Sequence, residues 1–522
     1  MSSTLELPGY RVVRGERPIP EEGLRNDVAA FLGRTDRGPL GVPVRVTSRL
    51  AYAAVYGRRR AGLATPRAVE AYFANDGEVA WVLRTGRGGA PATAAVKLGA
   101  VARGTWEPGG PVRLSLPGNR LRVTATSPGV WADGTAVTIT YRAFGLAGTP
   151  ELDVRIAVAD EPVVQRAGLA QNELLAAIAS SGLLTARFEG KPVTAAPAGR
   201  PSGPAQRSWT LTLGHGLDRG VEPQVARADY LEAVIEQAQV DEIALVCAPD
   251  LEADLIAPEQ EDVIAALAGA AAAGQDRLVV LATSLMRSTA LADWRTRIAL
   301  AVPDSPQQRA VAVYAPWLVA EDVTHSSADR YVPTNPVGHV CGVISKLDRE
   351  RGSGWAPANA LVNDAIDIAT SSTAAEQLFA VNQQVNLLRC RPGGGLEIWG
   401  ARTLDPGDGR HIAHRRLVHR IVRAIRRVAE PLVFDPNTDV LWFTVVRAVS
   451  GVLLEAFRSG FLQGETPDQA YRVRCDETTN TADTIDAGEV VCEIEIAPAV
   501  PMEFITLRLT LGAQGLLEVV EQ

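Results

Sequence analysis

Residues 464–511 read GETPDQAYRVRCDETTNTADTIDAGEVVCEIEIAPAVPMEFITLRLTL, and this stretch decides the fold of the C-terminal part of the chain. At 489–498 apolar side chains alternate with glutamates, and this period of two predicts a half-buried β-strand. A second alternating run at 503–511 predicts a partner strand. The segment 476–487 is polar and rich in turn-forming residues, so we expect an exposed loop. The stretch therefore predicts a hairpin-like unit beside an acidic loop.

The length and composition of the chain are those of a multidomain globular protein. At 522 residues, about three domains are expected. The net charge of −8 argues against a nucleic-acid coat, because such proteins need a basic surface. No apolar run looks long enough to span a bilayer, and the N-terminus lacks a signal-peptide pattern. The five cysteines are widely spaced without a CxxC motif, so we expect reduced, buried thiols rather than disulfides or a zinc site.

The order of periodic segments predicts an α/β protein with several domains. Continuous apolar runs such as 243–247 and 277–282 alternate with helical segments, which indicates a parallel sheet covered on both faces. Short alternating runs between 90 and 224 indicate β-rich structure. We therefore expect a mixed, parallel-sheet α/β core with an inserted β-rich domain and an α+β C-terminal domain that carries extended terminal arms. The expected divisions are an N-terminal arm at 1–25, a core formed by 26–89 with 225–400, an inserted outer domain at 90–224 and a C-terminal domain with its arm at 401–522.

Short motifs recur along the chain in a fixed order. They are SPGVW at 127–131, YAPW at 314–317, WAPAN at 355–359, FLQGETP at 461–467, RVRCD at 472–476, TTNT at 478–481 and PMEFI at 501–505. In these motifs and in their order the chain resembles contractile tail sheath proteins, which form the shortening outer tube of myovirus tails, R-type bacteriocins and phage-derived injection machines. The resemblance implies a polymerising structural protein whose α/β core has a subtilisin-like topology.

The segment 410–429 predicts an unusually basic helix, with seven arginines, three histidines and no acid. Helical spacing places Arg416, Arg420, Arg423 and Arg427 together, opposite an apolar face. Three roles are open for such a face: a solvated surface, a contact with phosphate or membrane, and docking on an acidic protein. In the sheath family a helix of the C-terminal domain holds the inner tube by charge complementarity. The resemblance therefore implies that these four arginines contact an acidic inner tube.

The same helix carries three clustered histidines, His411, His414 and His419. Neighbouring arginines would repel a metal ion there, so we expect surface histidines instead of a metal site.

Both ends of the chain have strand character without an evident partner, at 4–13 and at 515–520. Unpaired strands can add to the sheet of another chain, and in the sheath family the terminal arms join subunits in this way. The residues expected to take part in pairing between subunits are Tyr10, Val12, Val13, Val490, Ile494, Ile496, Ile505, Leu507, Leu509, Leu517 and Val519.

Motifs of catalysis are missing from the sequence: there is no GxxxxGK[ST], GxSxG or HExxH. We therefore expect no enzyme, no catalytic residues, no metal and no cofactor. The acidic residues of 476–486 could chelate Ca²⁺, but their spacing matches no EF-hand and favours a solvated loop. A hydrolase with a subtilisin-like α/β fold is an alternative, although the Asp, His and Ser order of subtilisin cannot be placed. A monomeric binding module is the third class.

The partners implied by the resemblance are other copies of the chain in a polymer of stacked rings, an inner tube protein, and baseplate and tail-terminator or cap proteins. No nucleic acid and no direct membrane insertion are expected. Assembly would take place in the cytoplasm as part of a tail-like particle or virion, with release from the cell as one outcome. The sequence leaves open whether the particle is a phage tail or a cellular injection machine.

Overall fold

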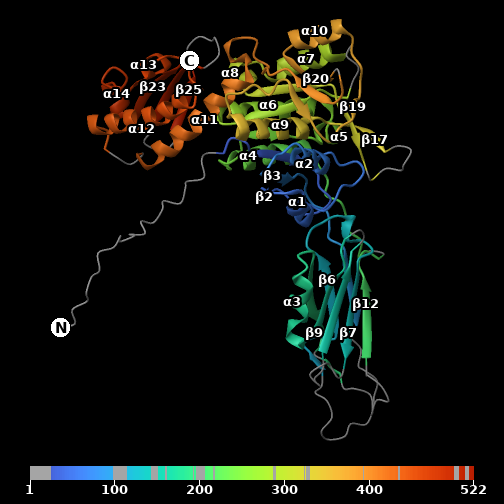
Figure 1. Cartoon of the computed structure of the whole chain (residues 1–522). Coiled ribbons are helices and arrows are strands. Elements are labelled where there is room, and N and C mark those ends of the chain that lie inside the picture. The colour runs from blue at the N-terminus through green and yellow to red at the C-terminus, as the bar shows by residue number, and fades with distance from the viewer. Residues whose placement is uncertain are drawn as a thin grey trace, which may run out of the picture.

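The computed structural model contains an α/β core, an elongated β-rich domain that projects from it, and a smaller C-terminal domain at its side (Figure 1). The several sheets and helices confirm the predicted mixed α/β class, while the domain boundaries stay predictions. The structure describes residues 25–97, 114–142, 151–158, 161–191, 193–195, 206–215, 218–285, 290–322, 324, 330–391, 393–432, 436–498, 505–511 and 517–521.

The core is built on a nine-stranded sheet of order β18-β21-β20-β15-β14-β13-β1-β3-β2. The strands from β3 to β20 in this order are parallel, and β2, β21 and β18 are antiparallel additions at the edges. The parallel sheet expected from continuous apolar runs is therefore present. The strands are β1 (Ala29–Gly33), β2 (Val44–Val46), β3 (Ala80–Arg84), β13 (Leu245–Cys247), β14 (Leu278–Ala282), β15 (Val311–Ala315), β18 (Ala360–Val362), β20 (Val385–Cys390) and β21 (Leu396–Trp399).

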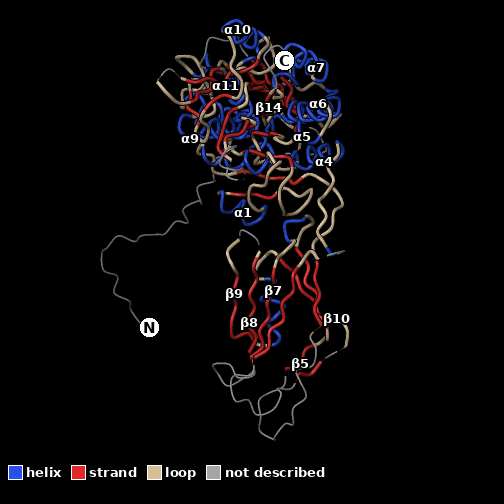
Figure 2. Tube along the Cα trace, turned by 90° about the vertical axis from the view of Figure 1, so that its right-hand side faces the viewer, coloured by secondary structure: helices blue, strands red, loops and turns tan. Residues whose placement is uncertain are grey.

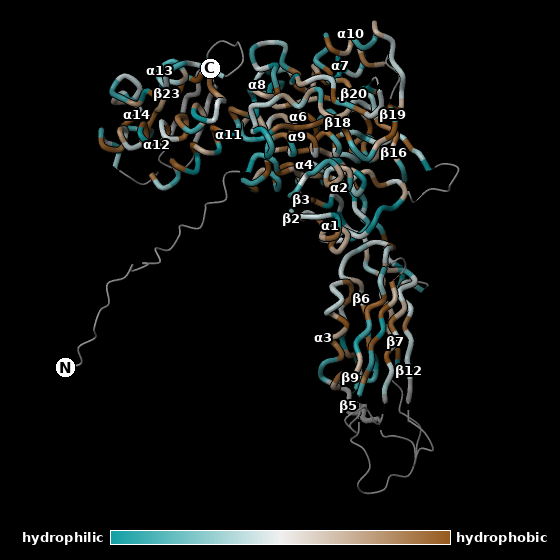
Figure 3. The backbone as a smooth tube through the Cα atoms, in the orientation of Figure 1, coloured by the Kyte–Doolittle hydropathy of each residue, from teal (hydrophilic) through white to brown (hydrophobic). Residues whose placement is uncertain are grey.

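Helices cover both faces of this sheet, so alternate side chains of each strand enter two separate hydrophobic clusters. Hydrophobic positions, brown in Figure 3, concentrate between these layers. One face carries α1 (Arg49–Tyr56), α2 (Thr65–Ala74) and α9 (Val337–Arg351). The other face carries α4 (Arg227–Ala238), α6 (Ala257–Gly274) and α7 (Leu291–Ala301), and the core also contains α5 (Leu251–Asp254), α8 (Ser305–Arg309) and α10 (Ala374–Asn382).

Two glycines of α9 let it approach α2 closely. A Cβ atom at Gly338 would lie 2.1 Å from the backbone oxygen of Ala68, and one at Gly342 would lie 2.6 Å from that of Tyr72. Any side chain at these two positions would push the helices apart. The packing therefore fixes how α9 presents its C-terminal end, which carries Asp348 and Arg349, to the neighbouring domain.

The strands of the β-rich domain lie side by side along its length (Figure 2) and form two main antiparallel sheets. Their inward side chains form a separate hydrophobic cluster. One sheet joins β4 (Thr93–Lys97), β6 (Arg120–Ala125) and β10 (Leu184–Glu189). The other joins β7 (Ala136–Arg142), β8 (Glu151–Ala157), β9 (Val164–Leu169) and β12 (Gln206–Thr212), with β5 (Leu114–Leu116) pairing β11 (Val193–Ala195) and helix α3 (Leu174–Ala179) completing the domain.

The chain enters and leaves this domain through a neck of two antiparallel segments. Backbone hydrogen bonds join Arg87 to Gln224 and Ala90 to Val221, with N–O distances of 2.8–3.1 Å. The buried Arg84 of β3 donates to the backbone oxygen of Pro128 at 3.2 Å and so ties the domain to the core. Arg37 also pairs with Glu161 at 2.9 Å, and the N–H of Gly38 donates to Oγ of Ser127 at 3.0 Å. The β-rich segment is therefore joined to the core by the neck and by these side-chain contacts.

The C-terminal domain packs two helices, α11 (Ile412–Ala429) and α12 (Asp439–Arg458), on a sheet of order β22-β23-β24-β25. The predicted hairpin is confirmed, since β23 and β24 pair antiparallel over seven residues. The strands are β22 (Tyr471–Arg474), β23 (Val490–Ile496), β24 (Ile505–Leu511) and β25 (Leu517–Glu521), and the short helices are α13 (Pro467–Ala470) and α14 (Ala482–Asp486).

The segment before β23 is only partly the exposed loop that its polarity predicts. Thr479 and Asn480 are buried. The Asn480 amide donates to the backbone oxygen of Val491 at 3.1 Å and accepts from its N–H at 2.7 Å. An asparagine side chain thus continues the backbone ladder of β23, which composition alone does not reveal.

The expectation that no apolar segment is long enough to span a bilayer is wrong for helix α12. Among the described helices it is long and apolar enough, by length and composition, to cross a membrane. Its side chains Trp442, Val445, Val449 and Leu453 are buried in the C-terminal core. A core helix of a globular domain has the same composition, so this single helix is weak evidence for a membrane span.

The neck predicts that the insertion can be removed without unfolding the core. Replacing residues 91–220 by Asn-Gly would join Ala90 to Val221 by a two-residue turn, because these residues already form a hydrogen-bonded pair. We expect a soluble protein with a cooperative urea transition, destabilised by about 1–3 kcal/mol because Arg84 loses the backbone oxygen of Pro128 and the buried Arg37 loses Glu161. Circular dichroism and urea unfolding of the shortened and full-length proteins test this. A shortened protein that is unfolded or aggregates would show that the core depends on the insertion.

Candidate interaction sites in the C-terminal domain

Helix α11 buries an apolar stripe in the C-terminal domain. Leu417, Ile421 and Ile425 recur at helical spacing and are at most 2% exposed, packed against α12 and β23. The helix ends before Pro431, which cannot continue the hydrogen-bond pattern. This face is the apolar face that the sequence predicts.

The cationic side of α11 packs against the α/β core. Arg416 donates to a carboxylate oxygen of Asp348 in α9 and to the backbone oxygen of Asn26. Further along the helix, Arg423 donates to the backbone oxygen of Asp241. Both sides of α11 are therefore covered, one by each domain.

A second ion-pair cluster lies at Arg426, just under one turn beyond Arg423. Arg426 pairs with Asp276 at 3.0 Å and also donates to the backbone oxygen of Gly274 at the end of α6. Arg277 donates to the same carboxylate group from its other side at 2.8 Å. Although burial opposes it, the hydrogen bond from Arg277 lowers the pKa of Asp276. Asp276 therefore stays charged and forms ion pairs with both Arg277 and Arg426.

Two of the four arginines that are expected to contact an inner tube are buried within the subunit. Arg416 is 1% exposed and Arg423 is 6% exposed, so neither side chain lies on a free surface. Arg420 is half-buried and Arg427 is exposed. Periodicity places the four side chains on one side of the helix, but it does not reveal that the core covers that side. Contact of Arg420 and Arg427 with an inner tube stays a prediction.

The prediction of surface histidines is also wrong, since His414 and His419 are buried. Burial lowers the pKa of His414 to about 4, and the nearby His411 adds to this. Burial and the adjacent arginines lower the pKa of His419 well below its ordinary value. Both rings are therefore neutral at pH 7, and neutral rings can pack beside buried cations. Within the described part of the chain, no cluster of His, Cys, Asp and Glu has the arrangement of a metal site.

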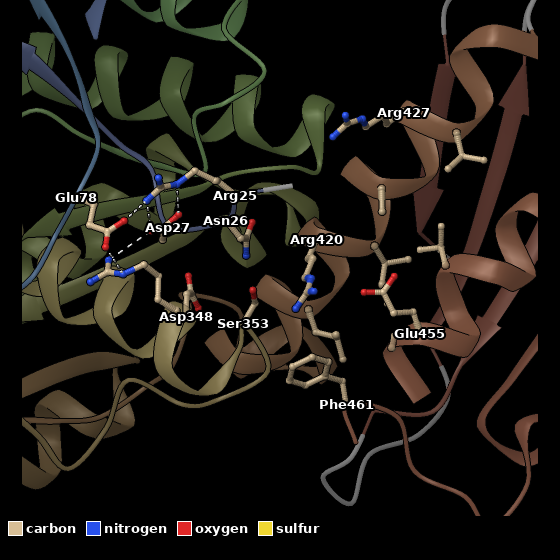
Figure 4. Close-up of a pocket in the computed structure, with 17 residues that line it drawn as sticks. Arg25, Asn26, Asp27, Glu78, Asp348, Ser353, Arg420, Arg427, Glu455 and Phe461 are labelled. Atoms are coloured by element: carbon tan, nitrogen blue, oxygen red, sulfur yellow. Dashed lines mark hydrogen bonds and ion pairs between the residues drawn. The ribbon is translucent and has the colours of Figure 1, made fainter. Parts of the chain in front are cut away.

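A groove of about 650 Å³ lies between α11 and the core (Figure 4). Arg420 and Arg427 enter it from the C-terminal domain, and the guanidinium of Arg420 lies 5.4 Å from the ring centroid of Phe461. The opposite wall is an ionic network in which Arg25 pairs with Asp27 at 2.8 Å and with Glu78 at 2.7 Å. The wall from the C-terminal domain is partly apolar and also carries Glu455, so its two arginines leave it with a net positive charge, and the opposite wall is an ion-paired network.

The residues that are expected to pair between subunits lie mostly inside the C-terminal sheet. Side chains of Val490, Ile494 and Ile496 are buried in the core of the domain. β23 pairs with β22 and β24, and β24, which contains Ile505, Leu507 and Leu509, pairs with β23 and β25. Neither strand has an open edge. Tyr10, Val12 and Val13 lie outside the described residues.

The expectation that the C-terminal strand lacks a partner in its own chain is wrong. β25 pairs antiparallel with β24, with Leu517 opposite Leu511 and Val519 opposite Leu509. The edges of the described sheet are consequently β22 and β25. Pairing between subunits stays a prediction, and it must use one of these edges or displace β25.

The acidic segment 476–487 uses a carboxylate for its own turn. Asp476 accepts from the backbone N–H of Thr478 at 2.8 Å. Hydrogen bonds from the Thr478 hydroxyl and backbone lower the pKa of Asp476. This is the behaviour of a turn-capping residue.

Comparison with known proteins agrees with the sequence motifs. Residues 408–512 match the family of the phage tail sheath C-terminal domain. The tail sheath protein of Enterobacteria phage T4 is 24% identical over 199 residues, which are 37% of this chain and 28% of that protein. The match thus spans less than a third of that relative.

Solved structures share the fold over nearly the whole chain. The sheath tail protein of Listeria innocua has a TM-score of 0.62 at 11% identity, covering 93% of this chain and 95% of that one. The sheath tail protein of Desulfitobacterium hafniense has a TM-score of 0.61 at 13% identity, covering 98% and 100%. The helical sheath of the anti-feeding prophage in its contracted state has a TM-score of 0.55 at 19% identity, covering 96% and 98%. The expected resemblance to contractile tail sheath proteins is confirmed, in sequence for the C-terminal domain and in fold for the rest.

Removal of the buried ion pair between Arg416 of α11 and Asp348 of α9 should reduce the free energy of unfolding by a large amount that depends on pH. Arg416→Ala would leave a buried carboxylate on Asp348, so we expect a loss of about 3–5 kcal/mol at pH 7. Burial raises the pKa of Asp348 to about 6 even with Arg416 present, and the variant would raise it further. A raised carboxyl pKa stabilises the fold below the unfolded pKa, and this contribution is lost as pH rises through the folded pKa.

The loss caused by Arg416→Ala should therefore be smaller at pH 5 than at pH 7, as measured by urea unfolding at both values. The matched control is Arg427→Ala, which makes the same substitution at an exposed position of the same helix and should change stability by less than about 0.5 kcal/mol. Equal losses in the two variants, or a loss that does not change with pH, would contradict this account of the interface.

Proposed function

We propose that this chain is a structural subunit of the contractile sheath of a phage tail or a tail-like injection machine. The single observation that carries the proposal is the tail sheath C-terminal domain at 408–512, joined to a core with the fold of solved sheath proteins. Subunits would polymerise in stacked rings around an inner tube, and contraction would drive the tube through a target envelope. Such a role needs interfaces with two stable arrangements and no bound nucleotide.

A structural role also fits the environment of the histidines better than the hydrolase alternative does. His339 shares a hydrogen bond with the backbone oxygen of Asp364, and neither ring nitrogen of His419 has a hydrogen-bond partner among the described residues. A catalytic triad instead requires a histidine oriented by a carboxylate and bonded to a serine. The partners that follow from the proposal are other copies of the chain, an inner tube protein, and baseplate and terminator proteins, assembled in the cytoplasm.

Of the four arginines proposed from the sequence to contact an inner tube, we keep Arg420 and Arg427 as the contact residues. These two side chains line the groove, whereas Arg416 and Arg423 hold the helix to the core. An acidic loop of the tube protein would complement the cationic wall. Each exposed ion pair contributes only about 0–1 kcal/mol, so the attraction would be decisive through repetition along the polymer.

Reversing the charge of these two arginines should prevent assembly on tubes without unfolding the subunit. We expect Arg420→Glu/Arg427→Glu to remain soluble and to melt like the wild type, but to form no extended sheath when mixed with purified inner tubes. Negative-stain microscopy measures sheath length. The matched control, Arg155→Glu/Arg166→Glu, makes the same charge change on exposed positions of the β-rich domain and should assemble normally. Sheaths of normal length from the groove variant would refute the tube contact.

The N-terminal arm is proposed to join subunits by adding residues 4–13 to the C-terminal sheet of a neighbour. The described sheet offers two edges, β22 and β25, to such a strand. Main-chain hydrogen bonds would supply the affinity, and alternating side chains such as Val12 would supply the register. An arm that contributes contacts only between subunits can be removed without affecting the fold of one subunit.

Deletion of residues 1–20 should therefore leave a folded monomer whose thermal unfolding is unchanged, while abolishing tubes in electron micrographs. Val12→Pro should have the same effect, because proline removes a backbone donor from the added strand. Its matched control, Ser2→Pro, lies outside the expected strand and should assemble normally. Tubes of normal length from the truncated protein would show that the arm does not hold the polymer together.

A further inference from the structure

Two cysteines occupy opposite positions at the end of the β22–β23 ladder. The register runs from Tyr471 opposite Ile496 to Arg474 opposite Glu493, and one further step brings Cys475 opposite Cys492. Both are free cysteines in the structure. Opposite residues of an antiparallel pair have Cα separations of about 4.5–5.5 Å, which lie within the range of disulfides.

The hydrogen bonds of the Asn480 side chain show whether Cys475 and Cys492 form a hydrogen-bonded or a non-hydrogen-bonded pair of the antiparallel ladder. It bonds both the N–H and the C=O of Val491, so those backbone groups point to the β22 side of β23. Backbone groups of the next residue, Cys492, then point the other way, toward β24. Cys475 and Cys492 therefore form a non-hydrogen-bonded pair, in which opposing side chains come closest.

The register places the two cysteines opposite each other, and Nδ2 of Asn480 lies 3.6 Å from Sγ of Cys475. Hydrogen bonding from Cys492, and to a smaller extent from Asn480, lowers the pKa of Cys475, and the interaction with Cys475 raises the pKa of Cys492. Cys475 is 8% exposed, whereas Cys492 is fully buried. Cys475 is thus the thiol that an oxidant reaches first, and Cys492 is placed to resolve the adduct.

We propose that Cys475 and Cys492 are a redox modification site that closes to a cross-strand disulfide when the protein meets a low-molecular-weight disulfide. The Cys475 thiolate attacks one sulfur of the small disulfide and expels the first small thiolate. Cys492 then loses its proton and attacks Sγ of Cys475, which expels the second. One small disulfide is reduced to two thiols while the two protein thiols are oxidised. The resulting bond lies in the sheet that is proposed to receive the terminal arms and fastens β22 to β23.

A second pair of cysteines supplies an internal control. Cys247 in β13 and Cys341 in α9 belong to the same hydrophobic cluster, and both residues are fully buried. Burial, and then the interaction with Cys341, raises the pKa of Cys247. Sγ of Cys247 also lies 3.5 Å from the backbone oxygen of Ala30. Attack by an external disulfide needs access to a sulfur atom, so this pair should remain reduced. Exposed Cys390 has no cysteine opposite it in its strand pair and should at most carry a mixed disulfide.

The test treats the folded, full-length protein with oxidised glutathione, alkylates remaining thiols in denaturant, and maps cysteine peptides by mass spectrometry. We expect a linked Cys475–Cys492 peptide, with Cys247 and Cys341 alkylated. The oxidised protein should melt several degrees higher than the reduced protein, and dithiothreitol should reverse the shift. Cys475→Ser should abolish both the linked peptide and the shift.

Cys492→Ser should instead trap glutathione on Cys475. Because this variant alters a buried position, the wild-type peptide map is the decisive measurement if the variant does not fold. Recovery of Cys475 and Cys492 in alkylated form, while Cys390 of the same sample carries glutathione, would overturn the proposal. So would glutathione retained on Cys475 of the wild type.

Discussion

The burial of α11 on both sides is the constraint on which the arrangement of the two domains depends. Its apolar stripe belongs to the C-terminal core, and its arginines reach into the α/β core. Buried charge is costly unless it is paired and hydrogen-bonded. Asp348 and Asp276 supply carboxylates, while Asn26, Asp241 and Gly274 supply backbone oxygens. This satisfies only part of each guanidinium, since Nε and Nη1 of Arg416 and Nη1 of Arg423 have no hydrogen-bond partner among the described residues. The neutral state of His419 follows from burial first and from the neighbouring arginines second, because a charged imidazole would add a further buried cation.

The sequence was sufficient to predict the central sheet and the C-terminal hairpin, because both depend on local periodicity. A continuous run such as Val279–Leu281 identifies a strand that is buried on both faces, and the alternation at 489–496 identifies one that is buried on one face. The order of short motifs was sufficient to indicate the family. Each of these signals is contained in one short stretch of the chain.

The features that sequence reasoning missed all depend on contacts between distant residues. The burial of Arg416 depends on Asp348, which lies 68 residues away. The polarity of 476–487 suggested only a loop, because the bond between Asn480 and Val491 requires β23 to be in place. The widely spaced cysteines suggested isolated thiols, because the pairing of Cys475 with Cys492 follows from strand register and not from any spacing motif. Composition specifies which side chains a helix face carries, but not which surface covers that face.

Attachment of α11 at two separate places makes it a mechanical coupling between the domains. The pairs of Arg416 with Asp348 and of Arg426 with Asp276 are ten residues apart on the helix, which is roughly 15 Å of α-helix. One ion pair would allow the C-terminal domain to pivot, whereas two pairs at this separation resist rotation about either one. The insertion is attached differently, through a neck of paired backbone and through contacts of Arg37, Gly38 and Arg84 with it. Helix α11 thus ties the C-terminal sheet to α9 through Arg416 and to the end of α6 through Arg426, and neither of these two pairs involves the β-rich domain.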